Sequence, residues 1–325
     1  LSRGFNAGSS FESQNLVSLE LASACRSFHS APLPSAGEVR TMHCSALRRC
    51  GALARAWVRC PHEAPEGERL RVLHFNVLAN CLARSASILD AQRGFRCEAE
   101  ALQWSHRSGL LREELLRHQS DIIGLNEVDE YDDISQGLTG KGYAGTFKLK
   151  RSPAKDGVAV FWRDGRLEQA LRRVVFLEQG VRRTKGAQVA LLQRLRILPS
   201  GRSIVVCATH LKASAEAAEL RVQQAAEVVS ALADFSRGSE EAIVLADVNS
   251  DAPSSGAAQG MTSSVFEYFA ACGYRCAYRS VGEAIQTCSD ASIGSLPSYT
   301  TFAGWASGDF RSVCDHIFVS RGIHV

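Results

Sequence analysis

Apolar residues along this chain gather in short runs that end in polar residues, and the pattern begins near Arg69. Runs of about four to eight residues rich in Val, Ile and Leu are typical of buried strands. We therefore predict strands at Leu70–Leu78, Asp121–Val128, Gly157–Arg163, Ala187–Ile197, Ser203–His210, Ala242–Asn249 and Val313–Ser320.

Three longer stretches space their apolar residues as one face of a helix does. They are Glu98–His118, Glu216–Phe235 and Ser263–Cys272. In the second stretch, Leu220, Ala225, Val228 and Leu232 recur at helical spacing, so this face would pack on a sheet. Strands interleaved with a few amphipathic helices predict an α/β sandwich.

Residues 1–67 follow a different pattern from the rest of the chain. They are rich in Ser and Ala, contain Arg but no Lys, and hold few acidic residues. An Arg-rich, Ser-rich and acid-poor leader resembles an organelle transit peptide, and the alternative is an undirected disordered tail. We expect a disordered or targeting leader at 1–67, one domain at 68–325, and a cytoplasmic or mitochondrial (organellar) location.

The composition of the 325 residues is that of an ordinary globular protein, with 45% hydrophobic and 22% charged residues. The net charge of +3 indicates little about partners, and no concentrated basic stripe of the kind found in nucleic-acid binders stands out. The 11 cysteines are scattered, which favours reduced thiols over a disulfide scaffold. No apolar run approaches the roughly 20 residues of a membrane span, so we predict none.

Polar residues that interrupt or end apolar runs are the most informative feature of the sequence. A buried carboxylate or amide is costly unless it is paired, hydrogen-bonded or bound to a metal. A turn or helix cap would explain any one of them, but six in the same setting are harder to explain that way. The six are Asn76, Glu127, His210, Asp247, Asn249 and Asp315.

Side chains two residues apart on a strand share a face. Asp247 and Asn249 would therefore point together, and so would His210 and Lys212 if that strand continues. Three carboxylates, two amides and one histidine suit a hard cation such as Mg²⁺. A structural zinc site is disfavoured, because the set has one histidine and no cysteines at zinc-ligand spacing.

The order of these residues resembles the endonuclease/exonuclease/phosphatase superfamily. Further stretches, Ala101–Trp104, Gly142–Phe147 and Tyr299–Phe302, resemble its nocturnin-like branch of deadenylase-type exonucleases. The superfamily landmarks read Phe75-Asn76-Val77-Leu78-Ala79, Asn126-Glu127-Val128-Asp129-Glu130, Asp156-Gly157-Val158-Ala159, Thr209-His210-Leu211-Lys212-Ala213, Asp247-Val248-Asn249-Ser250 and Asp315-His316-Ile317.

The resemblance implies a DNase I-like, four-layer αββα sandwich with an active site at the sheet ends. It also implies a Mg²⁺-dependent phosphoesterase, with Mn²⁺ as a possible substitute. Glu127, helped by Asn76, would hold the metal. Asp247 would activate or position the attacking water, and Asn249 would orient it. Such a reaction is a metal-assisted in-line displacement at phosphorus.

The resemblance assigns three further roles around the phosphoryl group. His210 would donate to the phosphoryl oxygens as charge develops there. Asp315 would tune a neighbouring histidine or a second metal ion. Lys212 would contact a substrate phosphate as a point charge.

The chain departs from the superfamily pattern near its end, where a Ser-Asp-His motif with an essential histidine would be expected. The sequence stops at Val325 without it. His316 is no substitute, because it is adjacent to Asp315 on a strand and the two should face opposite sides. We therefore expect a C-terminally truncated domain that lacks its last core strand.

Other departures leave the substrate open. Ser214 and Ala303-Gly304-Trp305 stand where basic residues would be expected, although Lys148, Lys150, Arg151 and Lys155 could supply replacement charge. Trp305 could stack on a base or simply pack on the surface. The reaction would be 3′-exonucleolytic removal of poly(A) from RNA, or removal of the 2′-phosphate from NADP(H). The alternatives are a lipid or inositol phosphodiesterase of the same superfamily, and a non-catalytic binding protein that kept the fold.

Overall fold

The computed structural model describes residues 68–88, 95, 97–177, 187–236, 240–250, 264–278, 300–305 and 308–325, and the backbone of 17–23. Most of the expected leader, 1–16 and 24–67, lies outside the described residues, so its targeting role stays a prediction. Within it, Val17–Ser23 forms strand β1.

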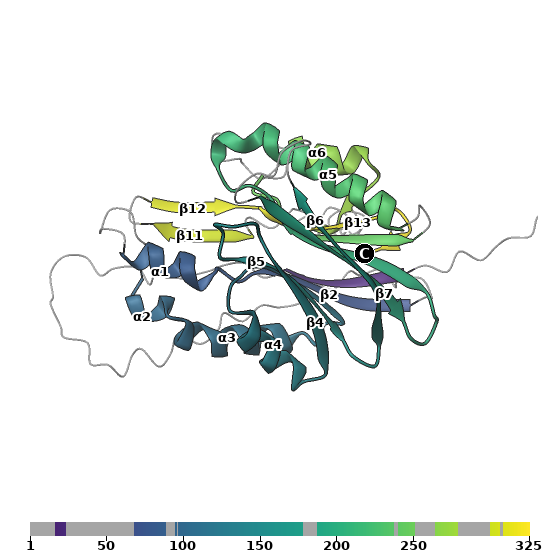
Figure 1. Ribbon diagram of the computed structural model, residues 1–325, viewed down its shortest axis with the longest axis horizontal. Coiled ribbons are helices and arrows are strands. Elements are labelled where there is room, and N and C mark those ends of the chain that lie inside the picture. Colours follow the sequence, from purple (N-terminus) through teal and green to yellow (C-terminus); the bar gives the residue numbers. More distant parts are fainter. Residues whose placement is uncertain are drawn as a thin grey trace, which may run out of the picture.

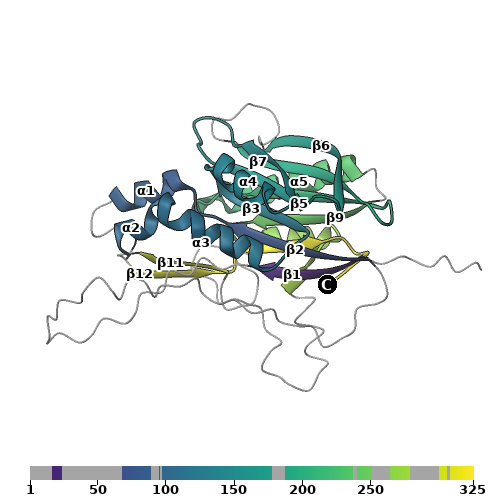
Figure 2. The ribbon, with the colours of Figure 1, turned by 90° about the horizontal axis from the view of Figure 1, so that it is seen from below.

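The first sheet has the strand order β14-β1-β2-β3-β5-β4. Strand β1 pairs in parallel with β2 on one side and β14 on the other, and β2 pairs in parallel with β3. Figure 2 shows β1 beside β2, close to the C-terminal end of the chain. The other strands of this sheet are β2 Glu68–Asn76, β3 Ile122–Val128, β4 Tyr143–Leu149, β5 Gly157–Arg163 and β14 Ile323–His324.

The second sheet has the order β10-β13-β9-β8-β7-β6. Strands β8 and β9 are parallel, and β13 runs antiparallel to β9. A separate hairpin joins β11 Thr301–Trp305 to β12 Gly308–Ser312. The strands of the second sheet are β6 Leu167–Leu177, β7 Gln188–Ile197, β8 Ser203–His210, β9 Glu241–Asp247, β10 Arg275–Cys276 and β13 Asp315–Val319.

Helices cover the outer face of each sheet, so the layers follow the predicted αββα order (Figure 1). Apolar side chains of α3 and α4 pack on the first sheet, and those of α5 and α6 pack on the second. A third cluster fills the space between the two sheets. The helices are α1 Asn80–Ile88, α2 Ala99–Leu102, α3 Trp104–Arg117, α4 Tyr131–Thr139, α5 Ala218–Ser236 and α6 Ser264–Ala271, with a 3₁₀ turn η2 at Ala215–Ala217. The predicted fold class is confirmed.

The structure corrects several predicted elements. The helix predicted over Glu98–His118 is two helices, because Gln103 is extended, with φ −69° and ψ 138°. Strand β9 ends at Asp247 rather than Asn249, and β8 ends at His210. Strands β4 and β6 and helices α1 and α4 were not predicted.

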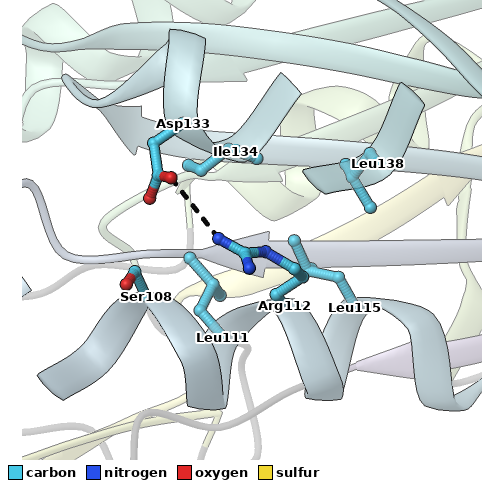
Figure 3. A pocket seen from close by; sticks show the side chains of 7 residues that line it. All are labelled: Ser108, Leu111, Arg112, Leu115, Asp133, Ile134 and Leu138. Carbon is cyan, nitrogen blue, oxygen red and sulfur yellow. Dashed lines mark hydrogen bonds and ion pairs between the residues drawn. The ribbon is translucent and has the colours of Figure 1, made fainter. Parts of the chain in front are cut away.

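The helices α3 and α4 meet at a small pocket on the outside of the first sheet (Figure 3). Arg112 and Asp133 form an ion pair of 3.4 Å across it, beside Leu111 and Leu115 of α3 and Ile134 of α4. None of the six polar residues singled out in the sequence lines this pocket, so it belongs to helix packing. Among the helices that the structure describes, none is both long and apolar enough to span a membrane.

Candidate active site

Four of the six polar residues meet because each continues an apolar row that faces the space between the sheets. On a strand, every second side chain lies on the same face. In four strands this row is buried between the sheets and ends in a polar residue at the same edge. The rows are Leu70, Val72 and then Asn76 in β2; Ile204, Val206, Ala208 and His210 in β8; Ile243, Leu245 and Asp247 in β9; and Val319, Ile317 and Asp315 in β13.

Strand pairing fixes which of these residues are neighbours. Asp247 is the Cα partner of both His210 in β8 and Asp315 in β13. In the first sheet, Asn76 is the partner of Asn126 in β3. The two sheets also approach closely here, because a Cβ on Gly124 would lie 2.4 Å from Leu245 Cδ1. The fold therefore brings the predicted residues of both sheets to one buried edge.

Asn76 links the two sheets directly. Its amide Nδ2 donates to Glu127 Oε1 at 2.8 Å and to Asp247 Oδ2 at 2.8 Å. Its Oδ1 accepts from the backbone N–H of Leu78 at 3.1 Å, which fixes the orientation of the amide. One neutral side chain therefore bridges two buried carboxylates that come from different sheets.

Glu127 reaches this position through a break in strand alternation. Its neighbours Ile123 and Leu125 face the helices, and regular alternation would send Glu127 to that side. A register shift between Asn126 and Val128, and a left-handed φ of 57°, turn Glu127 toward Asn76. A left-handed non-glycine residue costs about 1–3 kcal/mol, and such strain concentrates at functional sites.

Asn249 lies beyond the end of β9, so it reaches the site through a turn rather than through strand alternation. Its backbone is left-handed, with φ 48°, and its N–H donates to Asp247 Oδ1 at 3.0 Å. Its amide Nδ2 lies 2.8 Å from His210 Nε2 and donates to Leu211 O at 3.0 Å. Asp247, Asn249 and His210 thus form one connected unit, as predicted, although by a different local structure.

Lys150 and Asp156 also belong to this edge; the sequence analysis named Lys150 only as a source of replacement charge and Asp156 only as part of a superfamily landmark. Both are buried, they form an ion pair, and Lys150 Nζ lies 3.4 Å from His210 Nδ1. Gly157 makes this loop possible, because a Cβ there would lie 2.1 Å from Lys148 O. The Asp156-Gly157 pair and the lysine that follows β4 marked this loop in the sequence, but not its contact with His210.

The remaining predicted residues lie as follows. Asp315 is buried, and its Oδ2 accepts from Thr301 Oγ1 at 2.7 Å. His316 faces away from Asp315, with its ring 5.8 Å from that of Phe266, which confirms that the two point to opposite sides. Lys212 has an exposed side chain, and no contact of the described residues ties its Nζ to the buried cluster. The side chain of Trp305 lies outside the described residues.

The residues present fit a divalent cation. Glu127, His210 and Asp247 each offer a ligand atom, and these three atoms lie within 4.8 Å of one another. Two carboxylates this close repel each other, and the amide of Asn76 between them supplies no positive charge. Among the described residues, neither ring nitrogen of His74 and neither side-chain polar atom of Asn126 makes a hydrogen bond, although both residues are buried here. Carboxylate oxygens with one imidazole suit Mg²⁺ or Mn²⁺.

Comparisons with known proteins agree with this geometry. Nocturnin of Homo sapiens is 30% identical over 276 residues, which cover 81% of this chain and 58% of the relative. This chain therefore spans little more than half the length of that protein. The solved catalytic domain of human Nocturnin with a bound sulfate anion is 28% identical with a TM-score of 0.58, and the match covers 77% of this chain and 81% of that one.

A second solved structure shows the fold alone, because it is only 18% identical. It is ANGEL2, described as a 2′,3′-cyclic phosphatase in complex with adenosine-2′,3′-vanadate. Its TM-score is 0.58, and the match covers 77% of this chain and 84% of that one. The pattern of the Endonuclease/Exonuclease/phosphatase family matches residues 73–325, which include every predicted site residue. This chain belongs to the Endonuclease/Exonuclease/phosphatase family.

Proposed function

We propose that this chain is a divalent-metal-dependent phosphoesterase that hydrolyses a phosphoester bond of an adenine-containing nucleotide substrate. The observation that carries the proposal is the bridge from Asn76 to Glu127 and Asp247, with His210 beside it. Two buried carboxylates from different sheets, joined through one neutral amide, form an arrangement that folding stability alone does not favour.

The residues would divide the chemistry between them. Glu127 and Asp247 would hold Mg²⁺, which when bound polarises the phosphoryl oxygens and offsets their developing charge. Asp247 would also position the attacking water, because Asn249 N–H fixes its second oxygen. Asn76 would keep Glu127 and Asp247 at a constant separation. Positioning and charge stabilisation supply most of the rate in phosphoryl transfer.

His210 would face the phosphoryl group as a donor, between Asn249 on one side and Lys150 on the other. The Lys150 ammonium adds positive charge where negative charge grows during displacement. The side chain of Lys212 is exposed in comparison, and only its backbone is held, by Gln224 and Arg221. It would contact a substrate phosphate further from the reacting atom.

Two substrates fit the proposal. The first is the 3′ end of poly(A) RNA, cleaved one nucleotide at a time, and the second is the 2′-phosphate of NADP(H). The adenine base follows from the resemblance of the sequence to the nocturnin-like branch, and the position of Lys212 suits either a phosphodiester chain or a second phosphate of a dinucleotide.

The test is a panel assay on the full chain with Mg²⁺, comparing poly(A) RNA, NADPH and 2′,5′-linked adenylate. Glu127→Ala should lower turnover about a thousandfold or more, because it removes a metal ligand. Asn126→Ala is the matched control, since Asn126 is the adjacent buried residue and makes no side-chain hydrogen bond among the described residues. Its loss should be far smaller.

Each alternative has its own outcome in this panel. Equal losses in Glu127→Ala and Asn126→Ala would contradict the metal assignment. Hydrolysis of an inositol phosphate in place of all three adenine substrates would favour the lipid or inositol phosphodiesterase. Binding of adenylate with no turnover under any divalent cation would favour a non-catalytic binding protein.

A further inference from the structure

A second buried histidine lies at the same edge as the proposed active site. His74 is on β2, two residues before Asn76, and it continues the row of Leu70 and Val72 that faces the second sheet. It is 1% exposed. Its Nε2 lies 3.4 Å from Asp315 Oδ1, across the space between the sheets. Asp315 was expected to tune a neighbouring histidine or a second metal ion, and His74 is a histidine that lies next to it.

The opposite side of Asp315 is already held. Thr301 Oγ1 donates to Asp315 Oδ2 at 2.7 Å, and the backbone N–H of Asp315 donates to Thr300 Oγ1 at 2.9 Å. Oδ1 is thus the oxygen that faces β2 and His74. His74 Nε2 and Asp315 Oδ1 lie at ion-pair range rather than in a hydrogen bond. An electrostatic contact on Oδ1, opposite the hydrogen bond from Thr301, still favours one orientation of the carboxylate.

The orientation of Asp315 matters because Asp315 and Asp247 are direct partners in the β13–β9 ladder. Paired residues of neighbouring strands point to the same face, so the two carboxylates lie side by side. A side chain on β2 that holds the Asp315 carboxylate keeps the negative charge of Asp315 away from Asp247. Leaving a polar ring such as that of His74 buried without a hydrogen bond costs about 1–3 kcal/mol, which an apolar residue would avoid.

We propose that His74 is a positioning residue that holds the Asp315 carboxylate in place beside Asp247. The role rests on the proposed function, because it concerns the same site. His74 is buried and acts through Asp315 rather than on the substrate. The histidine that Asp315 faces is therefore His74, on β2.

Kinetics of four variants test the proposal with the full chain. His74→Leu should lower kcat about tenfold to a hundredfold, as losses of partners behind active-site residues do, with KM changed by less than about twofold. His74→Gln keeps an N–H donor near the position of Nε2 and should recover most of the activity. Asp315→Asn should lower kcat as well. The double variant His74→Leu with Asp315→Asn should be no worse than the poorer single variant.

His118 provides the matched control. It is also buried beside a carboxylate, with Nε2 3.5 Å from Glu114 Oε1, but it lies at the end of α3, away from the site. His118→Leu should leave kcat unchanged. Normal kcat in His74→Leu, an equal loss in His74→Gln, or additive losses in the double variant would each overturn the proposal.

A spectroscopic measurement separates this proposal from the proposed function. If the wild-type chain hydrolyses none of the panel substrates, the proposed function fails, but the contact between His74 and Asp315 can still be observed. Ring ¹⁵N chemical shifts of His74 should change in Asp315→Asn, while those of His118 stay constant. Unchanged His74 shifts would overturn the positioning role whatever the activity.

Discussion

The two ends of β3 each carry a buried carboxylate, and the charges around them differ. Asp121, just before the strand, accepts from Arg71 N–H at 2.7 Å. Its Oδ1 lies 3.3 Å from Arg166 Nη1 and 3.7 Å from Arg163 Nε. This carboxylate is neutralised by two guanidinium groups, so it can serve the fold alone.

Glu127, at the other end of the strand, accepts from the amide of Asn76 and from the N–H of Ala79, which are both neutral. Through Asn76, Glu127 is joined to a second buried carboxylate, Asp247. Asp121 and Glu127 are both buried, so their exposure to solvent does not distinguish the two ends of β3. Their neighbours do: two arginines face Asp121, whereas Asn76 joins Glu127 to another carboxylate. The Glu127 end is therefore the one at which we propose a bound cation.

The largest effect should come from isosteric changes at the two ends. Glu127→Gln should lower turnover about a thousandfold, because a metal ligand loses its charge. Asp121→Asn should leave turnover intact and lower the free energy of unfolding by about 2 kcal/mol, since the buried carboxylate loses its charge beside two partly exposed arginines. Activity assays and urea unfolding measure the two quantities. A folded but inactive Asp121→Asn protein would remove the distinction between the ends.

Divalent cations should distinguish the same two ends in thermal unfolding. A cation that binds only the folded state stabilises it by about 2.7 kcal/mol at a hundred times its dissociation constant. Mg²⁺ or Mn²⁺ should therefore raise the Tm of the wild-type chain and of Asp121→Asn. The shift should vanish in Glu127→Gln. A shift that persists in Glu127→Gln would place the cation elsewhere.

Lys150 is a buried cation at the Glu127 end, paired with Asp156 and close to His210. Lys150→Met keeps most of the side-chain volume and removes the charge. We expect kcat to fall about tenfold, because a fixed positive charge near the phosphoryl group is lost. Lys155→Met is the control, since Lys155 is exposed on the same loop. Equal effects of the two changes would indicate a general loss of positive charge rather than a specific contact.

The smallest effect concerns a thiol near the same end. Burial, together with the hydrogen bond and the negative charge of Asp129, raises the pKa of Cys81 to about 11. Asp129→Asn removes the charge and so lowers this pKa. Since pH 8 lies below the pKa, a lower pKa gives more thiolate and faster alkylation, by about threefold.

Peptide mapping by mass spectrometry after brief alkylation measures the rate at Cys81 alone. Asp132→Asn, an exposed residue in the first turn of α4, should leave the rate unchanged. Slower alkylation in Asp129→Asn would mean that Asp129 does not act through its charge.

The sequence predicted the strands whose side chains are buried on both faces. Strands β3, β5 and β8 have unbroken apolar runs, and their predicted bounds are within one residue of the observed ones. Strand β6 escaped prediction because it lies at a sheet edge, where six consecutive residues from Glu168 to Arg173 are exposed and carry no alternation. Edge strands lack the burial that produces a readable pattern.

The six polar residues could be predicted because each interrupts an apolar run. Their contacts could not, because these depend on how the two sheets stack. Nothing in the sequence shows that Lys150 approaches His210, or that His74 approaches Asp315, since both contacts join different sheets. The bulge that turns Glu127 was also hidden, because alternation alone would place this residue on the helix side.

Strand β1 makes the first sheet depend on pairings between segments that are far apart in the sequence. It lies between β2 and β14, and Val17 pairs with both Glu68 and Ile323. On the ribosome, β1 can pair with β2 soon after both have been made, but its other side has no partner until β14 has also been made. Pairings so distant in sequence form slowly, and an unpaired edge is prone to join other chains. The newly made chain would therefore depend on holding that edge apart from its neighbours during translation.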